Sequence, residues 1–94
     1  MTIGEIYKLS DAHPPAFGEV TSVTQNKIWN EILEEDEQVK LVWADWYQWN
    51  EKDVYCIQGG GFEVERLVPA TADEIAVYRQ KVEEYKNYWR VEND

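Results

Sequence analysis

Few residues in this sequence could carry nucleophilic or metal chemistry. A structural zinc site needs four Cys or His ligands, and the chain contains only Cys56 and His13. Asp11 and His13 could orient and deprotonate a Cys nucleophile. The pattern nevertheless places Cys56 in the middle of a strand, where a buried and unreactive thiol is expected. We therefore expect no catalytic residue, no metal and no cofactor, and a protein that is not an enzyme.

Two further segments, a triple glycine and a run of acids, could suggest ligand sites. A phosphate-binding loop opens a helix and often ends on Lys, whereas residues 59–61 are followed by the acidic segment Phe-Glu-Val-Glu. We expect a turn or a bulge between strands there. The acidic run at residues 34–37 lacks the alternating ligand spacing and the central glycine of a calcium loop.

The least ordinary segment is aromatic. It spans residues 43–49 and contains Trp43, Asp45, Trp46, Tyr47 and Trp49. In a strand, alternation sends Trp46 to one face and the other three aromatic residues to the opposite face. Two interpretations stay open. Either these rings form core on both faces, with the C-terminal helix covering one, or some of them are exposed as a binding hot spot.

The charge of the chain is strongly negative, with 19 Asp or Glu against 9 Lys or Arg and a net charge of −10. Such a charge repels phosphate backbones and anionic lipids, so we expect neither direct nucleic-acid binding nor a membrane partner. The acids are densest in one stretch, which contains Glu31, Glu34, Glu35, Asp36 and Glu37. Either they only keep the domain soluble, or they dock onto a basic partner with steered association.

Length and composition predict a single domain over residues 1–94. The chain is 44% hydrophobic and 14% aromatic, which is enough to build a core. One Cys cannot close an internal disulfide. The first residues lack a basic leader and an apolar run, and no segment reaches the roughly eighteen apolar residues of a membrane span. We therefore expect a cytoplasmic protein.

The elements that position these residues follow from hydrophobic periodicity. We expect an irregular segment over residues 1–16 and a β-rich core over 17–68, with strands at 17–24, 39–49, 54–58 and 62–68. The spacing of Ile28, Trp29, Ile32 and Leu33 predicts a helical insert over 26–37.

A long C-terminal helix is predicted over residues 71–91. Thr71 and Glu74 have the spacing of a capping box. An apolar stripe then follows at helical spacing, with Ile75, Tyr78, Val82, Tyr85 and Trp89. This stripe could pack on the sheet or form a seam with another helix.

The order of these elements resembles that of small SH3-like barrel proteins, which are often met in phage and mobile-element gene sets. Many of them end on a phrase close to FEVERLVPATADEI, residues 62–75. We therefore expect an α+β fold, with a small antiparallel (SH3-like) sheet or partial barrel, an acidic helical insert and a long C-terminal helix packed on it. The resemblance covers roughly residues 17–78 and implies a binding role.

The functional expectation is a non-catalytic acidic protein-binding module. It would inhibit a partner by occupying the partner's basic nucleic-acid-binding surface through phosphate mimicry, as in phage-type counter-defence. Its partner-binding residues would be the five acids of residues 31–37 with the aromatic segment. One alternative is a structural or assembly subunit, a possible homodimer, joined through Tyr78, Tyr85 and Trp89. Another is small-ligand or sugar binding on the aromatic segment.

Overall fold

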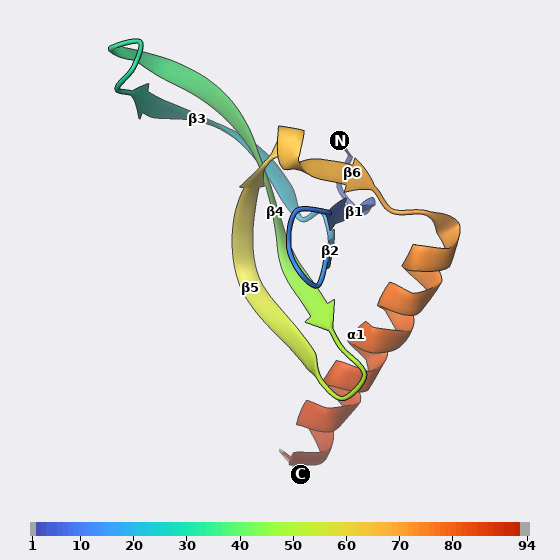
Figure 1. The fold of residues 1–94 in the computed structure, drawn as a ribbon. Coiled ribbons are helices and arrows are strands. Elements are labelled where there is room, and N and C mark those ends of the chain that lie inside the picture. Colours follow the sequence, from blue (N-terminus) through green and yellow to red (C-terminus); the bar gives the residue numbers. More distant parts are fainter. Residues whose placement is uncertain (1, 93–94) are drawn as a thin grey trace.

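The chain folds as a curled antiparallel sheet with one helix packed against it (Figure 1). The computed structural model describes residues 2–92, with side chains up to residue 88. In chain order the elements are β1 (Ile6–Leu9), β2 (Ala16–Glu19), β3 (Ser22–Asn30), β4 (Glu35–Trp49), β5 (Val54–Glu63), a 3₁₀ turn η1 (Val64–Arg66), β6 (Leu67–Pro69) and α1 (Ala72–Glu92). The strand order is β3-β4-β2-β1-β6, and β5 pairs with β4. The α+β class and the partial antiparallel barrel with a C-terminal helix are confirmed, while kinship with SH3-like barrels stays a prediction.

One face of the sheet carries a core cluster that surrounds Trp46. The cluster consists of Tyr7, Leu9, Ala16, Val20, Val42, Ala44, Trp46 and Leu67. Trp46 is 0% exposed, and its indole N–H donates to the carbonyl oxygen of Gly60 at 2.7 Å. The ring of Phe62 meets the indole edge-on, with the ring centroids 5.2 Å apart. The one polar atom of this large side chain is therefore satisfied inside the core.

The opposite face of the sheet carries a second cluster, which α1 covers. The ring of Tyr47 meets those of Tyr78 and Tyr85 edge-on, with centroid distances of 5.9 and 5.6 Å. Nearby, Trp49 stacks on Phe17 with the centroids 5.0 Å apart. Successive residues of a strand point to opposite faces, so Trp46 and Tyr47 serve different clusters. The C-terminal half of β4 is thus covered on both faces.

The start of α1 has the predicted capping box. The backbone N–H of Thr71 donates to Glu74 Oε1 at 3.0 Å, and the N–H of Glu74 donates to Thr71 Oγ1 at 3.2 Å. Lys8 Nζ lies 2.8 Å from Glu74 Oε2, which joins the helix to β1. The hydrogen bond from Lys8 lowers the pKa of the Glu74 carboxyl most, and the hydrogen bond from the backbone N–H of Thr71 lowers it further. The helix begins one residue after the cap, as a capping box requires.

The N-terminal segment is not irregular, contrary to the prediction for residues 1–16. β1 pairs antiparallel with both β2 and β6, and Tyr7 and Leu9 are core residues. The strand is only four residues long, which is too short for alternation to stand out from its surroundings. The single strand predicted over 17–24 is also divided, because β2 ends at Glu19 and β3 begins at Ser22.

The predicted helical insert over residues 26–37 is wrong, because these residues belong to β3, a turn and the start of β4. The two strands pair from Ser22↔Trp43 to Asn30↔Glu35. The side-chain oxygen of Asn30 closes the turn by accepting the N–H groups of Ile32 and Leu33 at 3.0 and 3.1 Å. A helix here would have had an acidic C-terminus, which the helix dipole disfavours, and helices depend on packing for most of their stability.

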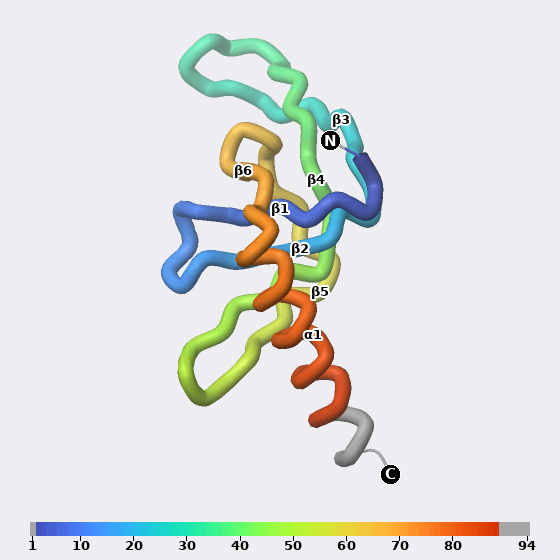
Figure 2. Tube along the Cα trace, turned by 90° about the vertical axis from the view of Figure 1, so that its right-hand side faces the viewer, coloured from blue at the N-terminus to red at the C-terminus, as the bar shows by residue number. Residues whose placement is uncertain are grey.

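We name residues 25–40 the hairpin arm, because over this range β3 and β4 pair only with each other. The arm projects beyond the rest of the sheet in both views (Figures 1 and 2). It lies at the end of β4 that is remote from the turn leading into β5. The long strand β4 therefore belongs to the core at one end and to a projecting element at the other.

Gly18 provides a test of the packing around Trp46. Gly18 pairs with Trp46 across β2 and β4, and a Cβ at residue 18 would lie 2.7 Å from Trp46 Cε3 and 3.0 Å from the Cβ of Ala44. Gly18→Ala should lower the free energy of unfolding by about 1–3 kcal/mol in urea denaturation, because it overpacks a rigid core. In a Trp46→Phe background, Gly18→Ala should lower the free energy of unfolding by a smaller amount, because the smaller ring leaves more room for the added methyl group. An equal cost in both backgrounds would contradict this packing.

Candidate functional site: an acidic hairpin arm

The five acids singled out in the sequence all lie at the tip of the hairpin arm. Glu31 and Glu34 belong to the turn, and Glu35, Asp36 and Glu37 open β4. All five residues are exposed. Among the described residues, no ion pair involves any of these carboxylates. The tip is therefore a concentrated and uncompensated negative charge.

Strand pairing divides the acids of the arm between its two faces. Glu37 pairs with Ile28, and Asp36 pairs with Trp29. Because paired residues point to the same side of a sheet, each carboxylate has an apolar neighbour across the arm. One acid is also held in place, since Asn30 Nδ2 donates to Glu37 Oε2 at 3.2 Å. Both faces of the arm thus combine negative charge with apolar surface.

The apolar side chains of the arm are the functional candidates that the sequence analysis missed. The spacing of Ile28, Trp29, Ile32 and Leu33 predicts one face of a helix. In the hairpin all four are exposed, Trp29 at 57% and Ile32 at 92%. The available signal was the position of these large apolar residues beside a run of acids. Exposed aromatic side chains within a charged surface are typical of binding anchors.

The aromatic segment belongs mainly to the core. Trp46 and Tyr47 are buried, one in each cluster. Trp49 is partly buried against Phe17. Trp43 is partly buried as well, and its indole N–H donates to Thr24 Oγ1 at 2.7 Å. Within residues 43–49 the rings are divided between two clusters and the base of the arm, so they form no continuous aromatic platform.

The bulge predicted at the three glycines lies within β5 and not between two strands, because residues 54–63 form one strand where two strands, over 54–58 and 62–68, are predicted. The pairing of β4 with β5 shifts register between Ala44 and Trp46. Opposite this irregularity, Gly59 has a φ of +62°, which glycine adopts without strain. Asp45 Oδ1 accepts the N–H of Gly59 at 2.9 Å. The structure therefore gives the exposed Asp45 carboxylate a local role in closing the bulge.

Two of the three helix residues proposed as a seam already contact the protein's own sheet. Tyr78 is buried, and both Tyr78 and Tyr85 lie against Tyr47. The side chain of Trp89 lies outside the described residues. A hollow of about 380 Å³ lies beside the last turns of the helix, lined by Lys52, Asp53, Val54, Glu84, Tyr85 and Tyr88.

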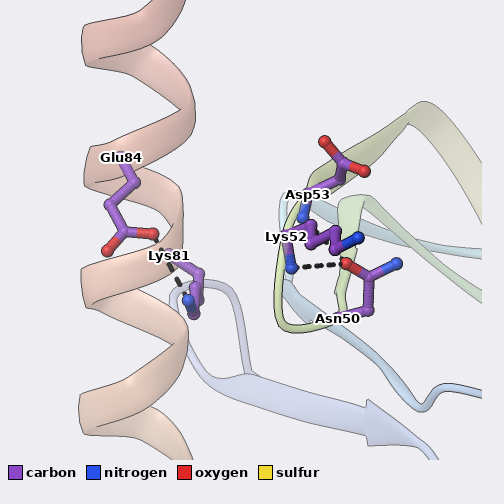
Figure 3. A network of polar contacts seen from close by, with 5 residues as sticks. All are labelled: Asn50, Lys52, Asp53, Lys81 and Glu84. Carbon is purple, nitrogen blue, oxygen red and sulfur yellow. Dashed lines mark hydrogen bonds and ion pairs between the residues drawn. The ribbon is translucent and has the colours of Figure 1, made fainter.

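Figure 3 shows two sets of polar contacts beside this hollow, one on the helix and one in the turn between β4 and β5. On the helix, Lys81 Nζ lies 3.4 Å from Glu84 Oε2. In the turn between β4 and β5, Asn50 Oδ1 accepts the N–H groups of Lys52 and Asp53, each at 2.8 Å. The hydrogen bonds and the ion pair drawn there do not bridge the helix and the turn.

Cys56 and His13 lie in different environments. Cys56 is partly buried in β5 opposite Tyr47, and burial raises the pKa of its thiol. A raised pKa disfavours the thiolate, which is the nucleophilic form. His13 lies in the loop between β1 and β2 and is exposed. Among the described side chains, no group of three His, Cys, Asp or Glu residues is arranged to hold a metal ion.

The contact between helix and sheet should make stability sensitive to alkaline pH. Burial raises the pKa of Tyr78 from 10.0 to about 12 and also raises the pKa of Tyr47. Folding then favours the protonated phenols, so this contribution to stability is full below pH 10 and is lost between pH 10 and about 12. Measured by urea denaturation across this pH range, the free energy of unfolding should decline less steeply for Tyr78→Phe than for the wild type. The exposed Tyr55 gives the control, and an equal effect of Tyr55→Phe would contradict the assignment.

No protein-family model, no curated protein and no solved structure matches this chain. In the described part of the chain, no helix is both long enough and apolar enough to cross a membrane.

Proposed function

We propose that the protein is a non-catalytic binding module that docks its hairpin arm onto a basic surface of a partner protein. The observation that carries this proposal is the exposed tip of the arm, where five acids adjoin Ile28, Trp29, Ile32 and Leu33. Over residues 25–40 the acids are opposed only by Lys27 and Lys40. The arm also projects from the sheet (Figure 2), so it can enter a concave surface that the rest of the molecule cannot.

Charge and apolar surface contribute differently to such an interface. The carboxylates steer association and favour a positively charged partner, which raises the association rate and makes it sensitive to salt. Burial of Trp29 and its apolar neighbours slows dissociation, because aromatic residues at the centre of an interface carry much of the binding energy. The arrangement therefore favours a protein partner with basic residues around an apolar depression.

A groove that binds nucleic acid is a basic surface of this kind, since it neutralises phosphates with Lys and Arg. We therefore extend the proposal to inhibition by phosphate mimicry, in which the carboxylates of the arm occupy the phosphate positions of such a groove. The resemblance to SH3-like proteins of phage and mobile elements agrees with a binding role. The internal packing of Tyr78 and Tyr85 favours this proposal over assembly through the helix.

Charge reversal at the tip tests the electrostatic part. A triple variant of the arm, Glu34→Lys, Glu35→Lys and Asp36→Lys, changes the net charge by the same amount as a control triple in other exposed residues, Glu51→Lys, Glu83→Lys and Glu84→Lys. Affinity capture from the native host should retain basic proteins on the wild type and on the control at low salt. The arm variant should lose them.

Raising the salt concentration should release the captured proteins, because the contact depends on exposed charges. Equal retention by both triple variants, or equal loss from both, would show that overall charge and not the arm determines capture. Retention that does not respond to salt would contradict the electrostatic mechanism.

A substitution of Trp29 tests the contribution of apolar surface to the proposed interface. Because its side chain is exposed, Trp29→Ser should change the free energy of unfolding by less than about 0.5 kcal/mol. The same change should weaken binding to a captured partner about tenfold or more, measured by calorimetry, because it removes an aromatic anchor. Tyr55→Ser, in an exposed aromatic residue of β5, is the matched control. Unchanged affinity of Trp29→Ser would remove Trp29 from the proposed interface.

A further inference from the structure

One edge of β4 is open along the hairpin arm. Over residues 35–40, β4 pairs with β3 on one side, while its pairing with β5 begins only at Leu41↔Glu63. After Glu63 the chain leaves the line of β5 through η1 (Figure 1). Within the described part of the chain, no strand therefore pairs with this side of β4 at residues 35–40. Backbone groups along such an edge are available to pair with another strand.

A groove of about 420 Å³ lies along this open edge. It is lined by Glu37, Gln38, Val39, Lys40, Glu63, Val64 and Glu65. Its two sides thus come from β4 and from the segment where β5 passes into η1. Val39 and Val64 supply partly buried apolar surface. The groove combines an unpaired strand edge with side-chain surface on both sides, as in sites where a peptide adds a strand to a sheet.

The charge of the groove selects its occupant. Three of its lining residues, Glu37, Glu63 and Glu65, are acidic, and Lys40 is its one base. A second copy would bring its own net charge of −10, with a second run of acids at residues 34–37, against this acidic surface, which is unfavourable. An extended segment with Lys or Arg at alternate positions would instead direct its cations to one face of the sheet, where Glu35 and Glu37 lie.

We propose that the open edge of β4 at residues 35–40 binds an extended basic segment of the partner protein as an added antiparallel strand. This inference rests on the proposed function and specifies how the partner is recognised. The added segment continues the line of β5 and pairs with the backbone of β4. Its alternate Lys or Arg side chains lie beside the acids of β4 and of the η1 segment.

A capped synthetic peptide of alternating Lys and Thr tests this inference with the full chain. NMR titration of the labelled protein should shift the amide signals of residues 35–40 and 63–65 most strongly. Methylation of alternate peptide N–H groups removes backbone donors but keeps every charge. It should weaken binding about tenfold or more if the peptide pairs as a strand.

Two charge variants locate the site. The double variant Glu63→Lys, Glu65→Lys reverses the charge of two residues that line the groove. The double variant Glu31→Lys, Glu34→Lys makes the same change of charge in the turn of the arm. The groove pair should weaken peptide binding about tenfold or more, and the turn pair less than about threefold, because only the groove pair is adjacent to the added strand.

Equal weakening by both pairs, with no effect of N-methylation, would overturn strand addition but leave docking of the acidic arm intact. No peptide binding at low salt would also overturn strand addition, while the capture experiment would still test whether the acidic arm docks onto a partner. Loss of capture specificity together with specific peptide binding at the groove would instead overturn docking through the tip of the arm.

Discussion

The pairing of β4 with β2, β3 and β5 is the constraint on which the rest of the structure depends. At its C-terminal end this strand of 15 residues places Trp46 in one cluster and Tyr47 in the other. Its neighbours must fit closely there, as the approach of Gly18 to the Trp46 ring shows. At its N-terminal end the same strand continues past the body of the sheet and, with β3, forms the hairpin arm.

This division of β4 separates stability from surface function. The aromatic residues near its end are largely covered by core or helix, so they contribute to folding through apolar burial. The acids near its beginning lie on an element that contributes little to the core, and substitutions there should leave the fold intact. A short chain can thus present a concentrated negative charge without placing carboxylates in the core, where unpaired charge is costly.

The sequence predicted those elements whose signals are local. The capping box of Thr71 and Glu74 marks the start of α1, and the alternation of β4 and the polar turn at residues 50–53 mark a hairpin. The helix predicted over residues 26–37 is wrong because Ile28, Trp29, Ile32 and Leu33 have helical spacing, whereas the hairpin is defined by pairing between β3 and β4 and by a turn that contains Ile32 and Leu33. β1 was missed because its place between β2 and β6 depends on residues distant in the chain.

Only those features of the candidate site that have a local signal could be predicted from the sequence. The density of acids at residues 31–37 is visible in the sequence, whereas the exposure of Trp29 and the open edge of β4 follow only from tertiary pairing. The aromatic segment illustrates the converse. Its composition suggests a binding surface, but the sheet buries Trp46 on one side and the helix covers Tyr47 on the other.

The central claim is that the hairpin arm, and not the helix, is the element that contacts the partner. Hydrogen–deuterium exchange of the protein alone and bound to a captured partner measures this directly. We predict that binding slows exchange mainly at residues 25–40, with a smaller effect at 63–65 and little change in α1. Protection concentrated in the last turns of α1, with the arm still exchanging as in the free protein, would contradict the account.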